Sequence, residues 1–323
     1  MIIVGIDVSK NKLDVSILLS NGKETHKVFE NNQNGFDKLI SWMASLRIKQ
    51  AHVCLESTGC YGEAIALVLH QQNHKVSIIN PLRIKAYARS EGCRTKTDKV
   101  DSGVIARFCK ALCPPAWNPP SLSEQKLKDL YRCRQNLLED KNRVSNRLEK
   151  FRQDQASIKI WQDLLASIES HLEKIEVHLK ELLLRDKTLN KQVELLKTIP
   201  GISDKTAIAI LAELPNIESF NTAKEVAAFA GLNPYVRQSG SSVKGKGRLS
   251  KVGNAQLRKA LYMPAIVAKK HNPLLVEFSK RLAKKGKPAM VIIAAGMRKL
   301  LHIIFGVLKS GRPFTYVRND LDG

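Results

Sequence analysis

Four acidic residues occupy positions where carboxylates can do chemistry. Asp7 ends the first apolar, β-branched segment of the chain, and Glu56 ends a second one. Asp98 and Asp101 are three residues apart, so on a helix their side chains share one face. Mg²⁺ prefers several carboxylate oxygens, and two such ions can stabilise both the entering and the leaving oxygen of a phosphodiester. We therefore predict a phosphoryl-transfer site that uses Mg²⁺, or Mn²⁺ in its place.

Each acid taken alone also has a structural explanation. Asp7 could cap a turn, and Asp98 and Asp101 could form the acidic first turn that a helix macrodipole favours. The basic stretch beside them, which contains Arg94 and Lys96, could attract the scissile phosphate or lie in solvent at a helix start. The order of all four acids, on suitable elements, favours the metal site.

The segments that carry these acids predict a mixed α/β sheet. Asn21-Gly22 is typical of a hairpin turn between two strands. Apolar periodicity and Gly or Pro breaks predict strands over 2–9 and 12–20, a third strand after the turn to about residue 29, and further strands over 51–56 and 75–80. The same signals predict helices over 35–46, 62–71, 81–90 and 97–110. This order fits the ribonuclease H-like fold, whose first strand carries an aspartate. The opening hairpin and the lack of G-x-G-x-x-G disfavour a dinucleotide-binding fold.

A proline-rich segment, 113–122, is predicted to link residues 1–112 to the rest of the chain. Residues 123–186 carry apolar side chains at spacings of three, four and seven, which predicts a helix pair or coiled coil. That segment could be a dimerisation arm or a spacer within one chain. Residues 187–323 are predicted to form a mostly helical, basic C-terminal domain.

The basic charge is concentrated near the C-terminus. The 323 residues include 53 Lys and Arg against 30 Asp and Glu, a net charge of +23. Residues 231–323 hold 19 of the basic residues and only three acids. Such an excess predicts a polyanionic partner, either nucleic acid or an anionic membrane surface.

Other sequence features favour a cytoplasmic protein that does not span a membrane. Arg298, Lys299 and His302 interrupt the most apolar stretch, 289–307, and the N-terminus lacks the basic region of a signal peptide. The six cysteines lack metal-ligand spacing and are typical of free thiols in a reducing compartment. We therefore expect nucleic acid as the polyanion, with the protein associated with the nucleoid.

Two segments of the C-terminal domain are expected to contact phosphates. Residues 195–211 predict two helices joined by a turn at Gly201, similar to a helix-hairpin-helix, which offers backbone N–H groups to a DNA phosphate. Ser203 stands where a second glycine is usual, and a purely structural turn is the alternative. The loop 235–254 and the segment that follows it supply basic side chains for phosphate: Arg237, Lys244, Lys246, Arg248, Lys251 and Arg258.

The same loop contains serines, among them Ser239. A nucleophilic serine needs a base or a metal to activate it, and no histidine lies in the loop. Composition alone therefore leaves a phosphate-binding loop and a flexible linker as equal alternatives.

Several motifs recur along the chain in an order that resembles one known family. They are Gly5-Ile-Asp-Val-Ser-Lys10, Leu55-Glu-Ser-Thr-Gly59, Asn80-Pro81, Arg94-Thr-Lys-Thr-Asp-Lys-Val-Asp101, Ile199-Pro-Gly-Ile202, Ala228-Phe-Ala-Gly-Leu-Asn-Pro234, Ser239-Gly-Ser-Ser242 and Leu257-Arg-Lys-Ala-Leu-Tyr-Met-Pro264. The sequence resembles the "one-ten" insertion-sequence transposases, a DEDD group that includes the Piv and MooV DNA invertases. The resemblance covers residues from about 3 to 318.

The resemblance implies a RuvC-like N-terminal domain, a coiled coil and a C-terminal transposase domain. It places the acidic tetrad on Asp7, Glu56, Asp98 and Asp101 and the nucleophile on Ser239. It implies site-specific recombination of donor and target DNA through a covalent phosphoserine link. It further implies a structured bridge RNA as guide, and homodimers or homotetramers in which tetrad and serine come from different protomers.

Other functions account for parts of the sequence. A hydrolytic nuclease, such as a Holliday-junction resolvase, would need the four acids but not Ser239, and a DNA invertase could act without an RNA guide. A non-catalytic nucleic-acid-binding protein would leave four ordered acids unexplained. An actin-like kinase also opens with Gly5-Ile-Asp7, but the chain shows no second matching domain and no adenosine site.

Overall fold

The computed structural model describes residues 1–19, 22–56, 61–93, 95, 97–150, 154–214, 216–235, 238–239, 243–244 and 247–316, with the backbone alone described at 238–239 and 243–244. The chain divides into two compact units, Met1–Pro119 and Pro120–Gly323. Asn21, Arg94, Lys96, Arg237 and Lys246 lie outside the described residues.

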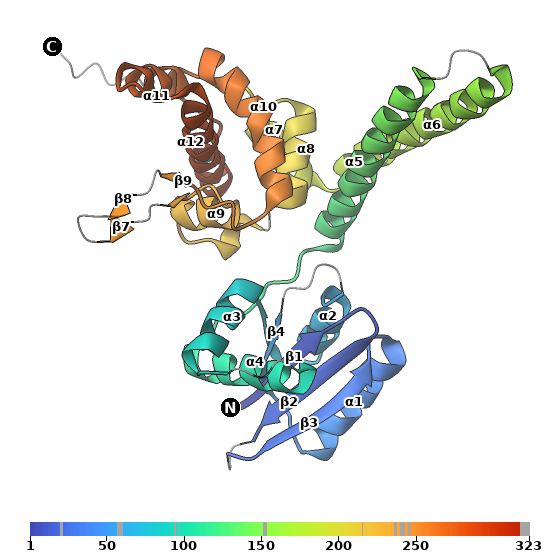
Figure 1. Cartoon of the computed structure of the whole chain (residues 1–323), viewed down its shortest axis with the longest axis vertical. Coiled ribbons are helices and arrows are strands. Elements are labelled where there is room, and N and C mark those ends of the chain that lie inside the picture. Colours follow the sequence, from blue (N-terminus) through green and yellow to red (C-terminus); the bar gives the residue numbers. More distant parts are fainter. Residues whose placement is uncertain are drawn as a thin grey trace. The chain divides into compact units, whose positions relative to one another are not determined.

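The first unit is built on a five-stranded mixed sheet in the order β3-β2-β1-β4-β5 (Figure 1). Its strands are β1 Ile2–Val8, β2 Lys12–Leu18, β3 Glu24–Glu30, β4 Ala51–Glu56 and β5 Lys75–Ile79. β2 is antiparallel to β1 and β3, whereas β4 is parallel to β1 and β5. The predicted antiparallel hairpin extended by parallel strands is confirmed, and this strand order is that of the ribonuclease H-like fold.

Helices cover both faces of this sheet. Successive side chains of a strand point to opposite faces, and both faces carry apolar side chains that the helices bury. The even-numbered residues of β1 pack with α1 (Gln33–Ser45) and α2 (Glu63–Gln71). The odd-numbered residues face α4 (Asp98–Leu112), beside α3 (Pro81–Ser90). Asp7 therefore lies on the face that α4 covers.

Gly5 allows α4 to approach β1 more closely than any side chain would permit. A Cβ atom on Gly5 would lie 2.3 Å from both the Ala106 backbone nitrogen and the Ser102 carbonyl oxygen. Both of these are backbone atoms of α4, so they cannot move aside as a flexible side chain could. The helix that carries two of the four acids is thus seated directly on the strand that carries the first.

A Gly5→Ala variant is expected to destabilise the first unit by about 1–3 kcal/mol, because the added methyl group forces α4 away from the sheet. The free energy of urea-induced unfolding measures the effect. Gly62→Ala is the matched control, since the nearest atom to its Cβ would be Leu55 Cδ1 at 3.5 Å, an ordinary van der Waals contact. Equal stability of the two variants would contradict the close packing described here.

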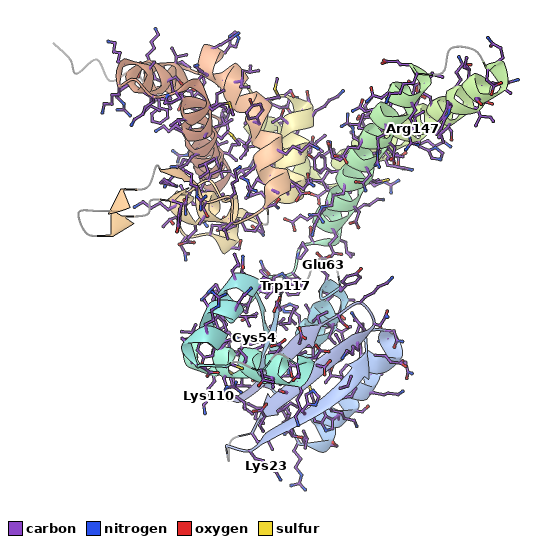
Figure 2. The ribbon with its side chains drawn as sticks, in the orientation of Figure 1. Lys23, Cys54, Glu63, Lys110, Trp117 and Arg147 are labelled. Carbon is purple, nitrogen blue, oxygen red and sulfur yellow. The ribbon has the colours of Figure 1, made fainter. Side chains whose placement is uncertain are left out.

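A proline-rich segment runs along the edge of the sheet after α4. The Trp117 backbone N–H donates to the Val76 carbonyl at 2.7 Å, and the Trp117 side chain packs against the core (Figure 2). The Ser77 hydroxyl donates to the Pro115 carbonyl at 2.7 Å. This segment is therefore anchored to β5 of the first unit as far as Trp117.

The second unit begins with a helical hairpin of α5 (Leu122–Leu148) and α6 (Gln155–Arg185). Ion pairs join Arg134 to Glu176 and Lys141 to Glu169, each at 2.7 Å. The partner number falls by seven as the α5 number rises by seven, so the two helices are antiparallel.

The base of this hairpin packs on the C-terminal helices. The Arg132 guanidinium makes two hydrogen bonds, at 2.9 and 3.0 Å, to the buried carboxylate of Glu213 in α8 (Asp204–Glu213). Leu127 and Tyr131 share a core with Ala209 and Ala212 of the same helix. The hairpin and the C-terminal helices consequently belong to one unit.

The remaining elements form a helical core with short strands at its surface. The helices are α7 Lys187–Lys197, α9 Ala223–Phe229, α10 Ala255–His271, α11 Pro273–Lys284 and α12 Ala289–Ser310, with a 3₁₀ turn Ile217–Ser219. The strands are β6 Pro234–Tyr235, β7 Gln238–Ser239, β8 Val243–Lys244 and β9 Arg248–Leu249. Within the described part of the chain, α12 is the one helix long and apolar enough to cross a membrane. It buries Leu300, Leu301 and Ile304 completely in the core of this unit.

Candidate active site

Three of the predicted acids, Asp7, Asp98 and Asp101, meet on the α4 face of the sheet. The fourth, Glu56, is close enough for its charge to repel that of Asp7. One carboxylate oxygen from each of Asp7, Asp98 and Asp101 lies within 4.8 Å of the others. Glu56 ends β4, the parallel neighbour of β1, and its register places it beside the end of β1. The ends of β1 and β4 and the first turn of α4 therefore bring together acids from three separate parts of the sequence.

The pKa of Asp7 is raised by burial and by this convergence of negative charge. Burial of the carboxylate, followed by repulsion from Glu56, Asp101, Asp98 and Asp14, raises the pKa of Asp7 to about 6. A carboxylate cluster of this kind is destabilised by its own charge unless a cation joins it. Hard divalent ions favour oxygen ligands of this type, so the donor set fits a divalent metal ion.

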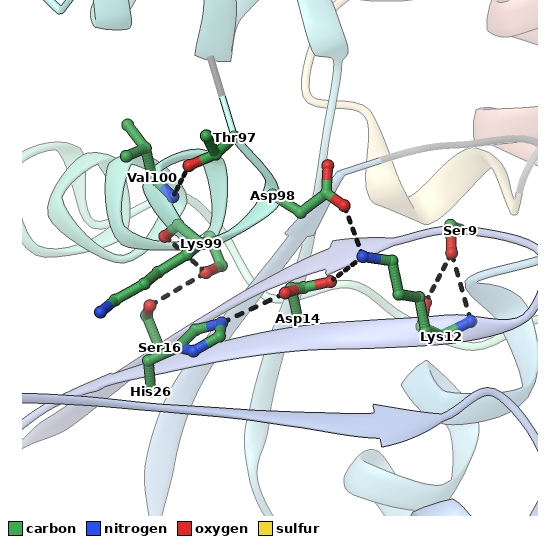
Figure 3. A network of polar contacts seen from close by, with 10 residues as sticks. Ser9, Lys12, Asp14, Ser16, His26, Thr97, Asp98, Lys99 and Val100 are labelled. Carbon is green, nitrogen blue, oxygen red and sulfur yellow. Dashed lines mark hydrogen bonds and ion pairs between the residues drawn. The ribbon is translucent and has the colours of Figure 1, made fainter. Parts of the chain in front are cut away.

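The N-terminus of α4 positions its two acids. Thr97 caps the helix by accepting a hydrogen bond from the Val100 N–H at 3.3 Å (Figure 3). The buried Ser16 and Ser102 hydroxyls are 2.9 Å apart, and Ser102 donates to the Lys99 carbonyl, so Ser16 is the donor in the first contact. This bond fixes α4 against β2 at the residue directly after Asp101.

A second polar network, which the sequence did not predict, adjoins the acids (Figure 3). The Lys12 ammonium lies 2.5 Å from Asp98 Oδ2 and 3.2 Å from Asp14 Oδ2. Asp14 is buried, and its other oxygen lies 3.2 Å from His26 Nε2. Asp14 is paired with Asp7 across the two strands. The sequence could have indicated Asp14 through the predicted hairpin, because the register of its two strands places residue 14 opposite residue 7.

A buried cluster of His52, Cys54 and Cys109 lies elsewhere in the same sheet–helix interface, with ligand atoms within 4.8 Å of one another. The Cys109 thiol and burial raise the pKa of Cys54, and burial followed by the charge of Lys75 lowers the pKa of His52 to about 4. His52 and Cys54 are therefore uncharged at neutral pH. The sequence showed no such cluster, because its members come from a strand and a helix more than fifty residues apart.

Ser239 lies in the second unit, in β7, where it pairs with Val243 of β8. Lys244 lies in β8 and pairs with Gln238. The structure thus describes a short hairpin at the serine motif, with backbone alone at these positions. Asp7, Glu56 and the two acids of α4 belong to the first unit.

The other predicted phosphate contacts have structural surroundings of their own. The Arg248 guanidinium stacks over the Tyr235 ring at 5.3 Å, and Lys251 has a positive φ of 56°. Arg258 Nη1 donates to the carbonyls of Ala230, at 2.9 Å, and Gly253, at 3.1 Å. Arg258 therefore holds the end of the serine loop in place.

Gly201 lies in the turn between α7 and α8 with a φ of 105°. A Cβ atom there would lie 2.9 Å from the Ala268 backbone nitrogen of α10. Close packing on α10 therefore accounts for the glycine, while its contact with phosphate stays a prediction.

Comparison with known proteins identifies similar sequences over nearly the whole chain. Residues 193–280 match the family model described as "Transposase IS116/IS110/IS902 family", and residues 4–154 match a second model, of IS110-type DEDD proteins, described as "Transposase". The pilin gene-inverting proteins of Moraxella bovis and Moraxella lacunata are each 36% identical over 96% of this chain and 97% of theirs.

More distant similarities extend this set. The transposase for insertion sequence element IS1111A of Coxiella burnetii is 22% identical over 83% of this chain and 78% of its own. The solved structure of Thermus thermophilus RuvC covers 36% of this chain and 99% of that chain, with 13% identity and a TM-score of 0.28.

Proposed function

The chain belongs to the IS116/IS110/IS902 family of transposases and is a DNA transposase or recombinase, and from this premise we propose how it works. We propose that it moves an insertion sequence by site-specific strand cleavage and exchange. The observation that carries this proposal is the convergence of Asp7, Asp98 and Asp101, with Glu56 beside them, on one face of the sheet.

These four carboxylates are the proposed ligands of the divalent cofactor, with Mg²⁺ as the ion and Mn²⁺ as its substitute. Bound there, the ion would polarise the phosphodiester and lower the pKa of an attacking hydroxyl. The protein's own contribution is positional: β1, β4 and α4 hold the oxygens in place before the DNA arrives. Burial of Asp7 strengthens the attraction between this cluster and a cation.

Ser239 is the proposed nucleophile. Its Oγ forms a bond to the scissile phosphorus as the bond to one DNA oxygen breaks, and the serine proton passes to the departing DNA hydroxyl. The phosphoserine link conserves the phosphodiester bond energy. A hydroxyl of a different DNA end can therefore attack the phosphorus and release Ser239 with its proton restored, with no need for a nucleotide cofactor.

The basic surplus of the second unit is proposed to bind the nucleic-acid backbone. Residues 231–323 carry 19 basic residues and three acids, and the serine loop lies within this stretch. Cations bind phosphate with little regard to sequence, which suits a protein that must hold two different DNA molecules. Contacts from this unit are assigned to the side chains of Arg237, Lys244, Lys246, Arg248, Lys251 and Arg258 and to the backbone at Gly201. Contacts from the first unit are assigned to Arg94 and Lys96.

A structured bridge RNA and self-association complete the proposal. Residues 123–186 are assigned as a coiled-coil dimerisation arm between a catalytic domain (1–112, with linker 113–122) and a transposase domain (187–323). Exposed apolar side chains along α6 support this assignment: Ile160, Leu164, Val177 and Leu184. A dimer or tetramer would let the acids of one protomer meet the serine of another. The proposed location is the cytoplasm, at the nucleoid and away from membranes.

Inversion of a DNA segment is a second candidate. It is favoured by the two Moraxella relatives, whose printed name is pilin gene-inverting protein. Inversion and transposition use the same cleavage chemistry and differ in which DNA ends are rejoined. A hydrolytic nuclease would use the acids alone.

RNA guidance is tested by sequencing the nucleic acid that co-purifies with the full chain. We expect one defined, structured RNA that survives DNase and is lost on RNase treatment. The Ser239→Ala variant should carry the same RNA, because the serine is assigned to the scissile DNA phosphate. Random fragments of DNA or RNA would contradict RNA guidance and leave a protein-guided recombinase.

A further inference from the structure

Lys12 occupies a position between two carboxylates that is typical of a bound cation. Its Nζ lies 2.5 Å from Asp98 Oδ2 and 3.2 Å from Asp14 Oδ2 (Figure 3). Asp98 is one of the proposed metal ligands, whereas Asp14 belongs to none of the motifs that predicted the site. The contact joins β2 to α4, two elements separated by 86 residues at this point.

The fold holds Lys12 at this place from both sides. Lys12 begins β2 immediately after the turn in which the Ser9 hydroxyl accepts from the Lys12 N–H at 3.2 Å and donates to the Lys12 carbonyl at 3.0 Å. Asp14, two residues further on the same face of the strand, is buried and held by His26 at 3.2 Å. The ammonium is thus anchored by a carboxylate that cannot turn away into water.

We propose that Lys12 is a built-in counter-cation of the carboxylate site, which a divalent ion must displace from Asp98 when it binds. This inference rests on the proposed function, since it takes Asp7, Asp98 and Asp101 as the metal ligands. The ligand class is a hard divalent cation, and Asp14 is the residue that receives the displaced ammonium.

Charge balance explains why the site needs such a group. The carboxylate of Asp7 is repelled by four others, those of Glu56, Asp101, Asp98 and Asp14. Before an ion binds, the Lys12 ammonium offsets part of their repulsion and keeps the first turn of α4 close to β2. After an ion binds, the same positive charge lies near a doubly positive one and repels it.

Loss of Lys12 therefore has two opposite consequences. The metal-free protein should become less stable, because the carboxylates repel one another without an internal cation. Metal binding should become tighter, because the ion no longer competes for Asp98. A lysine that served only as a structural tether would give the first effect without the second.

The experiment measures Mn²⁺ binding to the full chain by EPR of the free ion, together with thermal unfolding in EDTA and in saturating Mn²⁺. For Lys12→Met we expect about tenfold tighter Mn²⁺ binding, from the repulsion removed at roughly 5 Å. We also expect an unfolding temperature about 2–4 °C lower in EDTA, recovered when Mn²⁺ is added. Lys12→Gln, which keeps hydrogen-bonding capacity but not charge, should bind Mn²⁺ as tightly as Lys12→Met and provides the test if Lys12→Met does not fold.

Lys49→Met is the matched control. Lys49 is exposed and precedes β4, at the end of the strand opposite Glu56, so both readouts should equal those of the wild-type chain. Unchanged or weaker Mn²⁺ binding by the Lys12 variants would overturn the inference while the metal site stands. If the wild-type chain shows no Mn²⁺ binding that Asp101→Asn removes, the proposed metal site itself fails.

Discussion

An Asp101→Asn variant is expected to lose more than about 100-fold of its DNA-cleaving activity. Changing a residue that merely supports a metal ligand typically costs 10–100-fold, and Asp101 is assigned as a ligand itself. Asparagine keeps the size of the side chain and a neutral oxygen, so the change isolates the negative charge. Cleavage of supercoiled DNA that carries the element's ends, at a series of Mg²⁺ concentrations, measures the loss.

The same variant should be more stable than the wild type when metal is absent. Asp101 raises the pKa of Asp7, so its removal lowers that pKa from about 6 toward the ordinary value of 3.8. A raised carboxylate pKa means that the native state holds the proton more tightly than the unfolded state. Stability is then lost as pH rises from about 4 through 6, and Asp101→Asn should recover part of that loss.

Urea unfolding in EDTA at pH 4 and at pH 7.5 separates these effects. The gain from Asp101→Asn should be present at pH 7.5 and much smaller at pH 4, where the Asp7 carboxylate is protonated and no longer repels Asp101. Asp37→Asn, an exposed change on α1, is the control and should alter neither activity nor the pH dependence. Full cleavage by Asp101→Asn would remove the metal-site assignment.

A Ser239→Ala variant is expected to abolish strand exchange and the covalent protein–DNA adduct. The reaction as proposed has no other oxygen to hold the phosphorus between cleavage and rejoining, so the loss should reach the detection limit. Denaturing gels of end-labelled DNA detect the adduct, and sequencing of the products detects exchange. Nucleic-acid binding should remain, because one hydroxyl contributes little beside the basic residues of residues 231–323.

Ser250→Ala is the control for this variant. Ser250 lies just after β9, and its hydroxyl accepts from the Val252 N–H at 3.3 Å, which is a local turn contact. We expect normal adduct formation in that variant. Strand exchange that persists in Ser239→Ala would contradict the covalent mechanism. Cleavage by the wild-type chain without any covalent adduct would favour the hydrolytic nuclease.

The first unit was predictable because its signals are local. β-branched runs, glycine and proline breaks and the spacing of Asp98 and Asp101 each act over a few residues, and the predicted strand 51–56 coincides with β4. The fold then brings these acids together through standard strand pairing. Sequence patterns of this kind depend on period and not on distant contacts.

The contacts that modulate the site were not predictable in the same way. The position of Lys12 on Asp98 depends on how α4 lies across β2, and His26 reaches Asp14 only through the register of β2 and β3. The residues involved are ordinary charged ones with no special spacing. Likewise, the sequence left the turn at Gly201 as either a phosphate contact or a structural turn, because the docking of α10 on that turn is a long-range contact.

The direct seating of α4 on Gly5 has a consequence for ion size. Because no side chain separates the two elements at Gly5, the gap between Asp7 and the two acids of α4 has little room to widen or narrow. Mg²⁺ and ions of similar radius need oxygens at about 2.1 Å, whereas Ca²⁺ needs about 2.3–2.6 Å and more ligands. A rigid carboxylate frame would therefore discriminate between cations by radius, and Gly5, two residues before Asp7, would influence which ion the proposed site accepts.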